Sequence, residues 1–161
     1  MFFGWPECGL NKPILTKNKP VLWNDVLEIP ATSFRGVTLG LFKPYRYLST
    51  CGNSAKEIIS IIRKFNRSGV KIIVLTFHSF SFLGWNFNRS NYWVDTKKIA
   101  RFDNLLREIA KNDRKNVKSF RELYEIFKKN PGSILDSPEA VPKSSLFFAL
   151  SRLIGRFLQI F

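Results

Sequence analysis

The most regular alternation of apolar and polar positions in this chain lies between Ser54 and Gly69. Ser54, with Glu57 three residues later, has the pattern of a capping box at the start of a helix. Gly69 ends the pattern, as glycine commonly does after a helix. Between these signals, apolar residues recur at helical spacing: Ile58, Ile61, Ile62 and Phe65. The sequence therefore predicts a helix over this stretch.

A continuous apolar run follows directly, over residues 70–77, and it is rich in β-branched side chains. This pattern is typical of a strand that is buried on both faces. A shorter apolar run over residues 26–29, stopped by Pro30, predicts a second strand. Because a helix followed by a doubly buried strand implies a parallel sheet, we predict an α/β fold of parallel strands with flanking helices.

Residues 79–95 lack apolar periodicity and are predicted to form a long loop. The helix predicted after this loop has one apolar face, formed by Ile99, Phe102, Leu106 and Ile109. Residues 116–120 are expected to add a short strand. A second capping box, Ser119 with Glu122, then predicts a helix whose apolar positions are Phe120, Leu123 and Phe127.

The C-terminal part divides into a turn-rich linker, residues 131–144, and an amphipathic helix, residues 145–161. This helix is apolar around most of its circumference, and its narrow polar stripe consists of Arg152, Arg156 and Gln159. Three interpretations fit the pattern. The helix docks on its own domain or on the rest of a larger barrel, it lies in the plane of a membrane surface, or it binds a partner protein.

Composition adds a strong positive charge to this picture. The 161 residues, 45% of them apolar, are sufficient for one domain with its own core. Lysine and arginine number 26 against 12 acidic residues, a net charge of +14 that favours anionic partners. Residues 97–130 are basic, but their charges alternate with acids as on the solvated faces of amphipathic helices. Since no nucleic-acid motif accompanies them, we do not expect a nucleic-acid partner.

The cysteines and the two ends of the sequence indicate where in the cell the protein is expected. Cys8 and Cys51 are far apart, which predicts free thiols rather than a disulfide framework. The N-terminal residues lack the basic region of a signal peptide. The apolar C-terminal stretch contains arginines and is shorter than the roughly 20 residues that span a bilayer. We therefore expect a cytoplasmic or membrane-peripheral protein.

His78 is the single histidine of the chain, and it follows the predicted strand at residues 70–77. Working residues of α/β folds lie at the carboxyl ends of strands, and an imidazole can donate or accept a proton near neutral pH. His78 is therefore a candidate general acid. The alternative is a structural histidine whose ring nitrogens are bonded by backbone groups or by Ser79 and Ser81.

The predicted loop combines aromatic and amide side chains, namely Trp85, Asn86, Asn88, Asn91, Tyr92 and Trp93. Flat aromatic rings suit the CH faces of sugars and amides suit their hydroxyl groups, so Trp85, Asn86, Tyr92 and Trp93 are candidate substrate-binding residues. The alternative is a lid packed by its own aromatic side chains. With a single histidine and dispersed aspartates, the chain shows no metal site of its own.

Four stretches together resemble a known family: "VLEIPAT", "VLTFHSFSF", "VDTKKIARFDNLLREI" and "VKSFRELYEI". They are similar to the C-terminal part of the polysaccharide deacetylase domain (NodB-like, carbohydrate esterase family 4), and the likeness covers residues 26–127. The resemblance implies that residues 1–130 form a partial (β/α) barrel.

The resemblance also implies a function, a hydrolase that removes acetyl groups from an N-acetylated glycan with the help of a divalent, zinc-like metal. By this likeness His78 is the general acid. The metal-binding Thr-Phe-Asp-Asp and His-x-x-x-His motifs of the family are absent here, so we expect no cofactor and no activity in this chain alone, and a missing N-terminal deacetylase segment as partner. The alternative function is a basic, non-catalytic module that binds an anionic polymer, or a membrane surface through residues 145–161.

Overall fold

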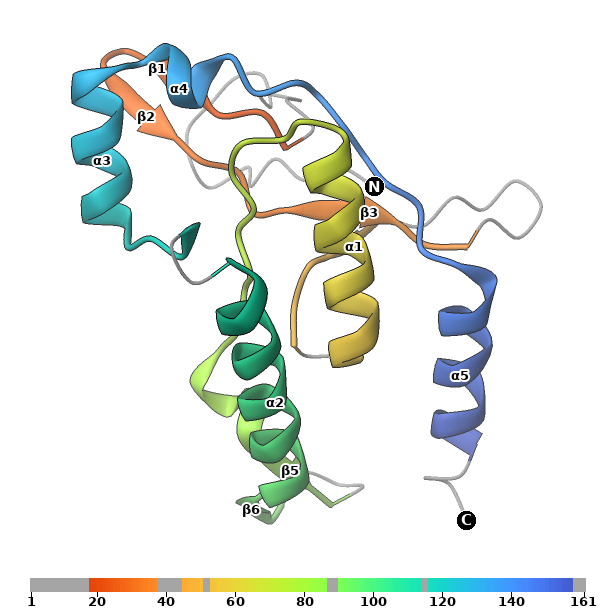
Figure 1. Ribbon diagram of the computed structural model, residues 1–161. Coiled ribbons are helices and arrows are strands. Elements are labelled where there is room, and N and C mark those ends of the chain that lie inside the picture. Colours follow the sequence, from red (N-terminus) through yellow and green to blue (C-terminus); the bar gives the residue numbers. More distant parts are fainter. Residues whose placement is uncertain (1–17, 38–44, 51–52, 87–89, 114–115, 158–161) are drawn as a thin grey trace.

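The computed structural model describes residues 18–37, 45–50, 53–86, 90–113 and 116–157 (Figure 1). Within them the chain forms a small α+β fold with three antiparallel two-stranded sheets. The sheets are β1–β2, β3–β4 and β5–β6, with bounds Val21–Trp23, Val26–Glu28, Ser33–Arg35, Tyr45–Tyr47, Leu83–Trp85 and Tyr92–Val94. The helices α1 to α5 span Ala55–Arg67, Thr96–Asp113, Phe120–Lys129, Gly132–Leu135 and Leu146–Phe157, and a 3-10 turn, η2, spans Ser79–Phe82.

The predicted α/β fold, with parallel strands and a partial barrel, is wrong. Parallel pairing within the described residues is limited to two isolated bridges, between Arg35 and Lys143 and between Ser49 and Thr76. All three sheets are antiparallel pairs of three-residue strands. A (β/α) barrel requires ladders between parallel strands, and the described residues form none.

The apolar run at residues 70–77 shows why the prediction failed. Its backbone is not part of a ladder, and only its Thr76 forms a bridge. Side-chain oxygens replace strand partners, because Val74 N–H donates to Thr32 Oγ1 at 2.7 Å and Lys71 N–H donates to Ser137 Oγ at 3.1 Å. The first part of the run is therefore held by hydroxyl groups from two distant segments, and only Thr76 is bonded to a neighbouring backbone, at residues 48–50.

Helix α1 confirms the prediction for residues 54–69. Ser54 Oγ accepts a hydrogen bond from the Glu57 N–H at 3.2 Å, and Gly69 follows the helix with a φ of 73°. The reciprocal half of the expected capping box is replaced, because the Glu57 side chain is fully buried and its carboxylate accepts from Ser144 Oγ. Helix α1 is thereby joined to a residue 87 positions further along the chain.

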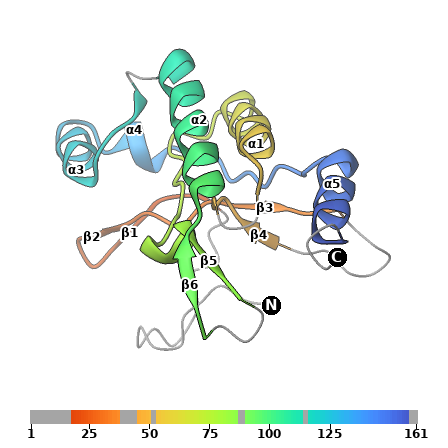
Figure 2. The ribbon, with the colours of Figure 1, turned by 90° about the horizontal axis from the view of Figure 1, so that it is seen from below.

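The hydrophobic core lies between α1, α2 and the β3–β4 sheet. Both helices lie on the same side of this sheet in the two views of Figures 1 and 2. The predicted apolar face of α2 is only partly correct, since Leu105 is its buried residue whereas Ile99 and Leu106 are exposed. The buried core cluster of the described residues consists of Phe34, Leu48, Ile58, Ile61, Phe65, Val70 and Leu105.

Helix α3 begins with the predicted capping box, here complete. Ser119 Oγ accepts from the Glu122 N–H at 3.3 Å, while the Glu122 carboxylate accepts from Ser119 N–H at 2.7 Å and from its hydroxyl at 2.8 Å. The short strand expected at residues 116–120 is absent from the described residues, because Phe120 already starts the helix. Local capping chemistry therefore outweighs the β-propensity of this stretch.

This capping box sets up a pH dependence. The backbone and hydroxyl donors of Ser119 lower the pKa of Glu122 below its ordinary value. The stabilisation of α3 is therefore complete above the unfolded-state pKa, about 4.3, and is lost as the pH falls through the lower folded-state pKa. In an NMR titration, we expect Ser119→Ala, which removes the hydroxyl donor and keeps the backbone N–H, to raise the pKa of Glu122. The control is Ser68→Ala, because Ser68 caps the C-terminal end of α1 and its loss should leave the pKa of Glu122 unchanged. An unchanged Glu122 pKa in Ser119→Ala would contradict the prediction.

Residues 131–144 pass back along the domain and contain α4. Arg35 N–H donates to the Pro142 carbonyl at 2.9 Å, and Ser144 N–H donates to the Arg35 carbonyl at 2.8 Å, so this segment borders β3. Helix α5 starts two residues later, within the range predicted for the C-terminal helix. It stands apart from α1, on the side away from α3 (Figure 1).

Candidate functional site

Three phenylalanine rings fix the segment that carries His78 onto α2. The Phe77 ring lies 5.1 Å from the Phe102 ring of α2, and the Phe82 ring of η2 lies 5.2 Å from the same ring, centroid to centroid. The rings are tilted by about the same angle, 52° and 51°. This arrangement is favourable for aromatic pairs, and it places η2 on the N-terminal half of α2.

The start of α2 holds β5 and β6 in place. Asp95 Oδ1 accepts from the Lys98 N–H at 3.1 Å, which satisfies a free donor of the first helical turn. The Lys98 ammonium donates to the Leu83 carbonyl and also lies 3.7 Å from the Asp95 carboxylate. In addition, Asp95 N–H donates to the Phe82 carbonyl at 2.8 Å. The hairpin is therefore attached at its base through both strands.

His78 lies directly before η2 and is exposed. Its ring stacks on Phe80, with centroids 4.7 Å apart and planes 9° from parallel. Ser81, named above as a possible partner of the ring, accepts a hydrogen bond from the His78 backbone N–H through Oγ at 2.9 Å. The imidazole is thus oriented by an aromatic contact and stands where a ligand in solution can reach it.

The predicted loop at residues 79–95 contains a β-hairpin that the sequence analysis did not predict. Strands β5 and β6 pair in antiparallel register, with Trp85 opposite Tyr92 and Gly84 opposite Trp93. A signal for it is present in the two short runs "LGW" and "YWV", because aromatic and β-branched residues next to asparagine and aspartate favour strands. The signal is weak because each run is only three residues long.

Trp85 and Tyr92 form one aromatic surface, here called the Trp85–Tyr92 face. Directly opposed residues of an antiparallel pair project on the same side of the sheet, and these two rings lie 5.6 Å apart with a 50° tilt. Both remain accessible, with 44% of Trp85 and 68% of Tyr92 exposed. Such a pair offers adjacent aromatic surfaces to a ligand.

Trp93 lies on the opposite side of the hairpin. Side chains alternate along a strand, so Trp93 projects away from its neighbour Tyr92. Its ring covers Gly84, where an added Cβ would fall only 2.4 Å from Trp93 Cε2. A cross-strand aromatic ring over a glycine compensates for the missing side chain. The structure therefore separates Trp93 from the other two aromatic candidates.

The Asn86 amide is used within the hairpin connection. Its Oδ1 accepts from the Asn91 N–H at 3.0 Å, and its Nδ2 donates to Ser90 Oγ at 2.8 Å. These bonds join the residue after β5 to the two residues before β6, so the amide supports the position of the neighbouring Trp85. Asn88, considered with it above, lies outside the described residues, as do Cys8 and Cys51.

The basic helices carry internal ion pairs. Along α2 and α3, Arg107 Nε lies 2.8 Å from Asp103, Lys111 Nζ lies 3.0 Å from Glu108, and Lys128 Nζ lies 3.1 Å from Glu125. The partners are one helical turn apart, which is the spacing of solvated helix faces. This geometry agrees with the interpretation of residues 97–130 as amphipathic helices with mixed charges.

The described residues contain one open depression but no group suited to bind a metal. Among the residues that the structure describes, no group of three or more His, Cys, Asp or Glu side chains is placed to hold a metal, so these residues do not fit the metal of the deacetylase family. An open depression of about 310 Å³ is lined by Arg35, Glu139, Ala140 and Val141, and none of the candidate site residues borders it. No described helix has the length and apolar character needed to cross a membrane.

Comparisons with protein-family models, with curated proteins and with solved structures found no match to this chain. The likeness to polysaccharide deacetylases consequently stays a prediction from the four sequence stretches. The structure provides a β5–β6 hairpin attached to α2 and an exposed histidine before it.

Proposed function

We propose that this chain binds an N-acetylated glycan through the Trp85–Tyr92 face, as the glycan-recognising segment of a deacetylase-like hydrolase. The observation that carries the proposal is the exposed, paired arrangement of these two rings on a hairpin that is attached at its base. Apolar CH faces of a sugar ring can stack on such aromatic surfaces.

The rigidity of the hairpin supports binding. A surface that is already ordered loses less conformational entropy when a ligand binds than a mobile loop does. The bonds of Lys98 to the Leu83 carbonyl and of Asn86 to Ser90 and Asn91 hold the hairpin at both of its ends. Trp85 and Tyr92 therefore meet the ligand in a fixed relative orientation.

In this proposal His78 acts as the proton donor of the hydrolase. The exposed position of its imidazole leaves the ring accessible to the leaving group of a bound substrate. Because the described residues do not fit the family's metal, the nucleophile must come from another segment. In the absence of that segment we expect glycan binding without acetate release.

The test is a titration of the full chain with an N-acetylglucosamine oligomer, followed by calorimetry and NMR. We expect Trp85→Ala and Tyr92→Ala each to weaken binding by about tenfold, equivalent to ~1.4 kcal/mol, because each removes one ring of the face. Trp23→Ala is the matched control, since Trp23 is 51% exposed on β1, in another hairpin, and its loss should leave the affinity unchanged.

Acetate release is measured in the same samples with zinc added. The proposal predicts binding and no release above the rate of the oligomer alone. If Trp23→Ala weakens binding as much as Trp85→Ala, the Trp85–Tyr92 face is not the binding site. Stoichiometric zinc binding with acetate release would show that this chain is a complete enzyme, contrary to the proposal.

A further inference from the structure

Helix α5 carries an apolar stripe that the rest of the described chain does not cover. Its members are more exposed than most apolar residues of the protein, with values of 62%, 69%, 50% and 60% for Leu146, Phe147, Leu150 and Ile154. At about 100° of rotation per residue, these positions fall within one arc of roughly 100°. The buried core cluster contains no residue of α5.

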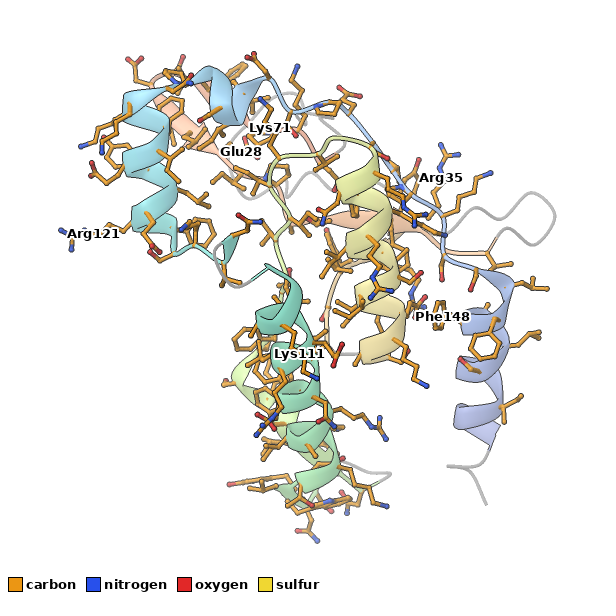
Figure 3. The ribbon with its side chains drawn as sticks, in the orientation of Figure 1. Glu28, Arg35, Lys71, Lys111, Arg121 and Phe148 are labelled. Atoms are coloured by element: carbon orange, nitrogen blue, oxygen red, sulfur yellow. The ribbon has the colours of Figure 1, made fainter. Side chains whose placement is uncertain are left out.

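The helix is attached to the domain at its N-terminal end. Ser144, two residues before α5, donates its N–H to the Arg35 carbonyl and its hydroxyl to the Glu57 carboxylate. Figure 3 shows Phe148 pointing from α5 toward α1, and this residue is only partly exposed. The stripe therefore has a fixed direction relative to the core, away from the position of Phe148.

The charge of this region selects among the surfaces that could cover the stripe. Residues 140–161 contain Lys143, Arg152 and Arg156 and no aspartate or glutamate, within a chain whose net charge is +14. An apolar stripe on a helix that has arginines and no acids, in a strongly basic chain, favours a position in the plane of an anionic lipid surface. A second copy of this basic chain would bring like charges together.

We propose that α5 anchors this protein to the surface of an anionic lipid bilayer. The helix lies parallel to the surface, with Phe147 and Leu150 among the acyl chains, and the net positive charge of the chain attracts it to the lipid phosphates. This anchor is separate from the glycan site, because it uses a different helix and different side chains.

The test measures partition of the full chain into vesicles of phosphatidylglycerol and phosphatidylcholine, against vesicles of phosphatidylcholine alone. We expect binding to the anionic vesicles that weakens steeply as salt is raised. Phe147→Glu should reduce it by at least tenfold. Phe120→Glu is the matched control, because Phe120 of α3 is 68% exposed and the substitution changes the net charge by the same amount.

Each outcome decides the proposal. Loss of binding in Phe147→Glu and in a second variant, Leu150→Glu, with retention in Phe120→Glu, supports it. Equal loss in all three variants, or no preference for anionic vesicles, overturns it. Sedimentation that shows a dimer of the wild type abolished by Phe147→Glu would instead assign the stripe to self-association. Trp85→Ala should bind vesicles normally, so this result separates the anchor from the glycan proposal.

Discussion

Phe65→Ala is expected to lower the free energy of unfolding by about 3–5 kcal/mol, the usual cost of removing a buried phenylalanine ring. Phe65 is completely buried in the last turns of α1 and belongs to the core cluster with Phe34 and Ile61. The surrounding side chains come from several segments and cannot all move into the space that is left. Since small domains have only about 5–15 kcal/mol of stability, the effect is a large part of the total.

Urea denaturation followed by circular dichroism measures this loss. Phe120→Ala is the control, because the same ring is removed from an exposed position on α3, and its effect should stay within about 0.5 kcal/mol. If Phe65→Ala does not fold, Phe65→Leu gives the milder comparison, expected to cost less than about 1.5 kcal/mol. Equal effects of Phe65→Ala and Phe120→Ala would contradict the position of the core.

Asn18→Ala is expected to destabilise the protein by about 2–4 kcal/mol. Asn18 is only 3% exposed, and its Oδ1 accepts from the Ser33 N–H at 2.7 Å. Its Nδ2 donates to the Ser33 carbonyl at 2.8 Å and to the Ala140 carbonyl at 2.7 Å. An unsatisfied buried group costs about 1–3 kcal/mol, and a φ of 63° adds roughly 1 kcal/mol for alanine.

Two further variants separate these contributions. Asn18→Gly removes the hydrogen bonds but adopts the positive φ without strain, so it should cost about 1 kcal/mol less than Asn18→Ala. Asn24→Ala is the control for backbone strain alone, because Asn24 has a φ of 45° in the exposed turn between β1 and β2. If Asn24→Ala were as damaging as Asn18→Ala, the buried hydrogen bonds would contribute nothing measurable.

Elements that depend on local chemistry could be predicted from the sequence. Helix α1 has its cap, apolar spacing and terminal glycine within the single stretch of residues 54–69, and α3 has a complete capping box. The apolar run at residues 70–77 has no comparable local determinant. Whether such a run becomes a strand depends on a partner backbone, and here side-chain hydroxyl groups of Thr32 and Ser137 occupy that role. Neither contact can be seen in the run itself.

The candidate site was predictable in composition and not in geometry. Aromatic residues near His78 indicated a binding surface, but the register of β5 and β6 decides which rings lie together. It places Trp85 with Tyr92 and sends Trp93 to the other side, over Gly84. Side-chain alternation changes with a shift of a single residue, so a list of aromatic residues cannot distinguish one face from the other.

The bonds of Ser144 to β3 and to Glu57 have a consequence for biosynthesis. The contact between Ser144 and Glu57 joins residues 87 positions apart, and that between Asn18 and Ala140 joins residues 122 apart. On a ribosome, the early strands and α1 emerge long before the residues that complete their hydrogen bonds. Native closure must therefore wait until nearly the whole chain has been made, and contacts of such sequence separation make folding slow. Until then, the side chains of Asn18 and Glu57 lack their hydrogen bonds to Ala140 and Ser144.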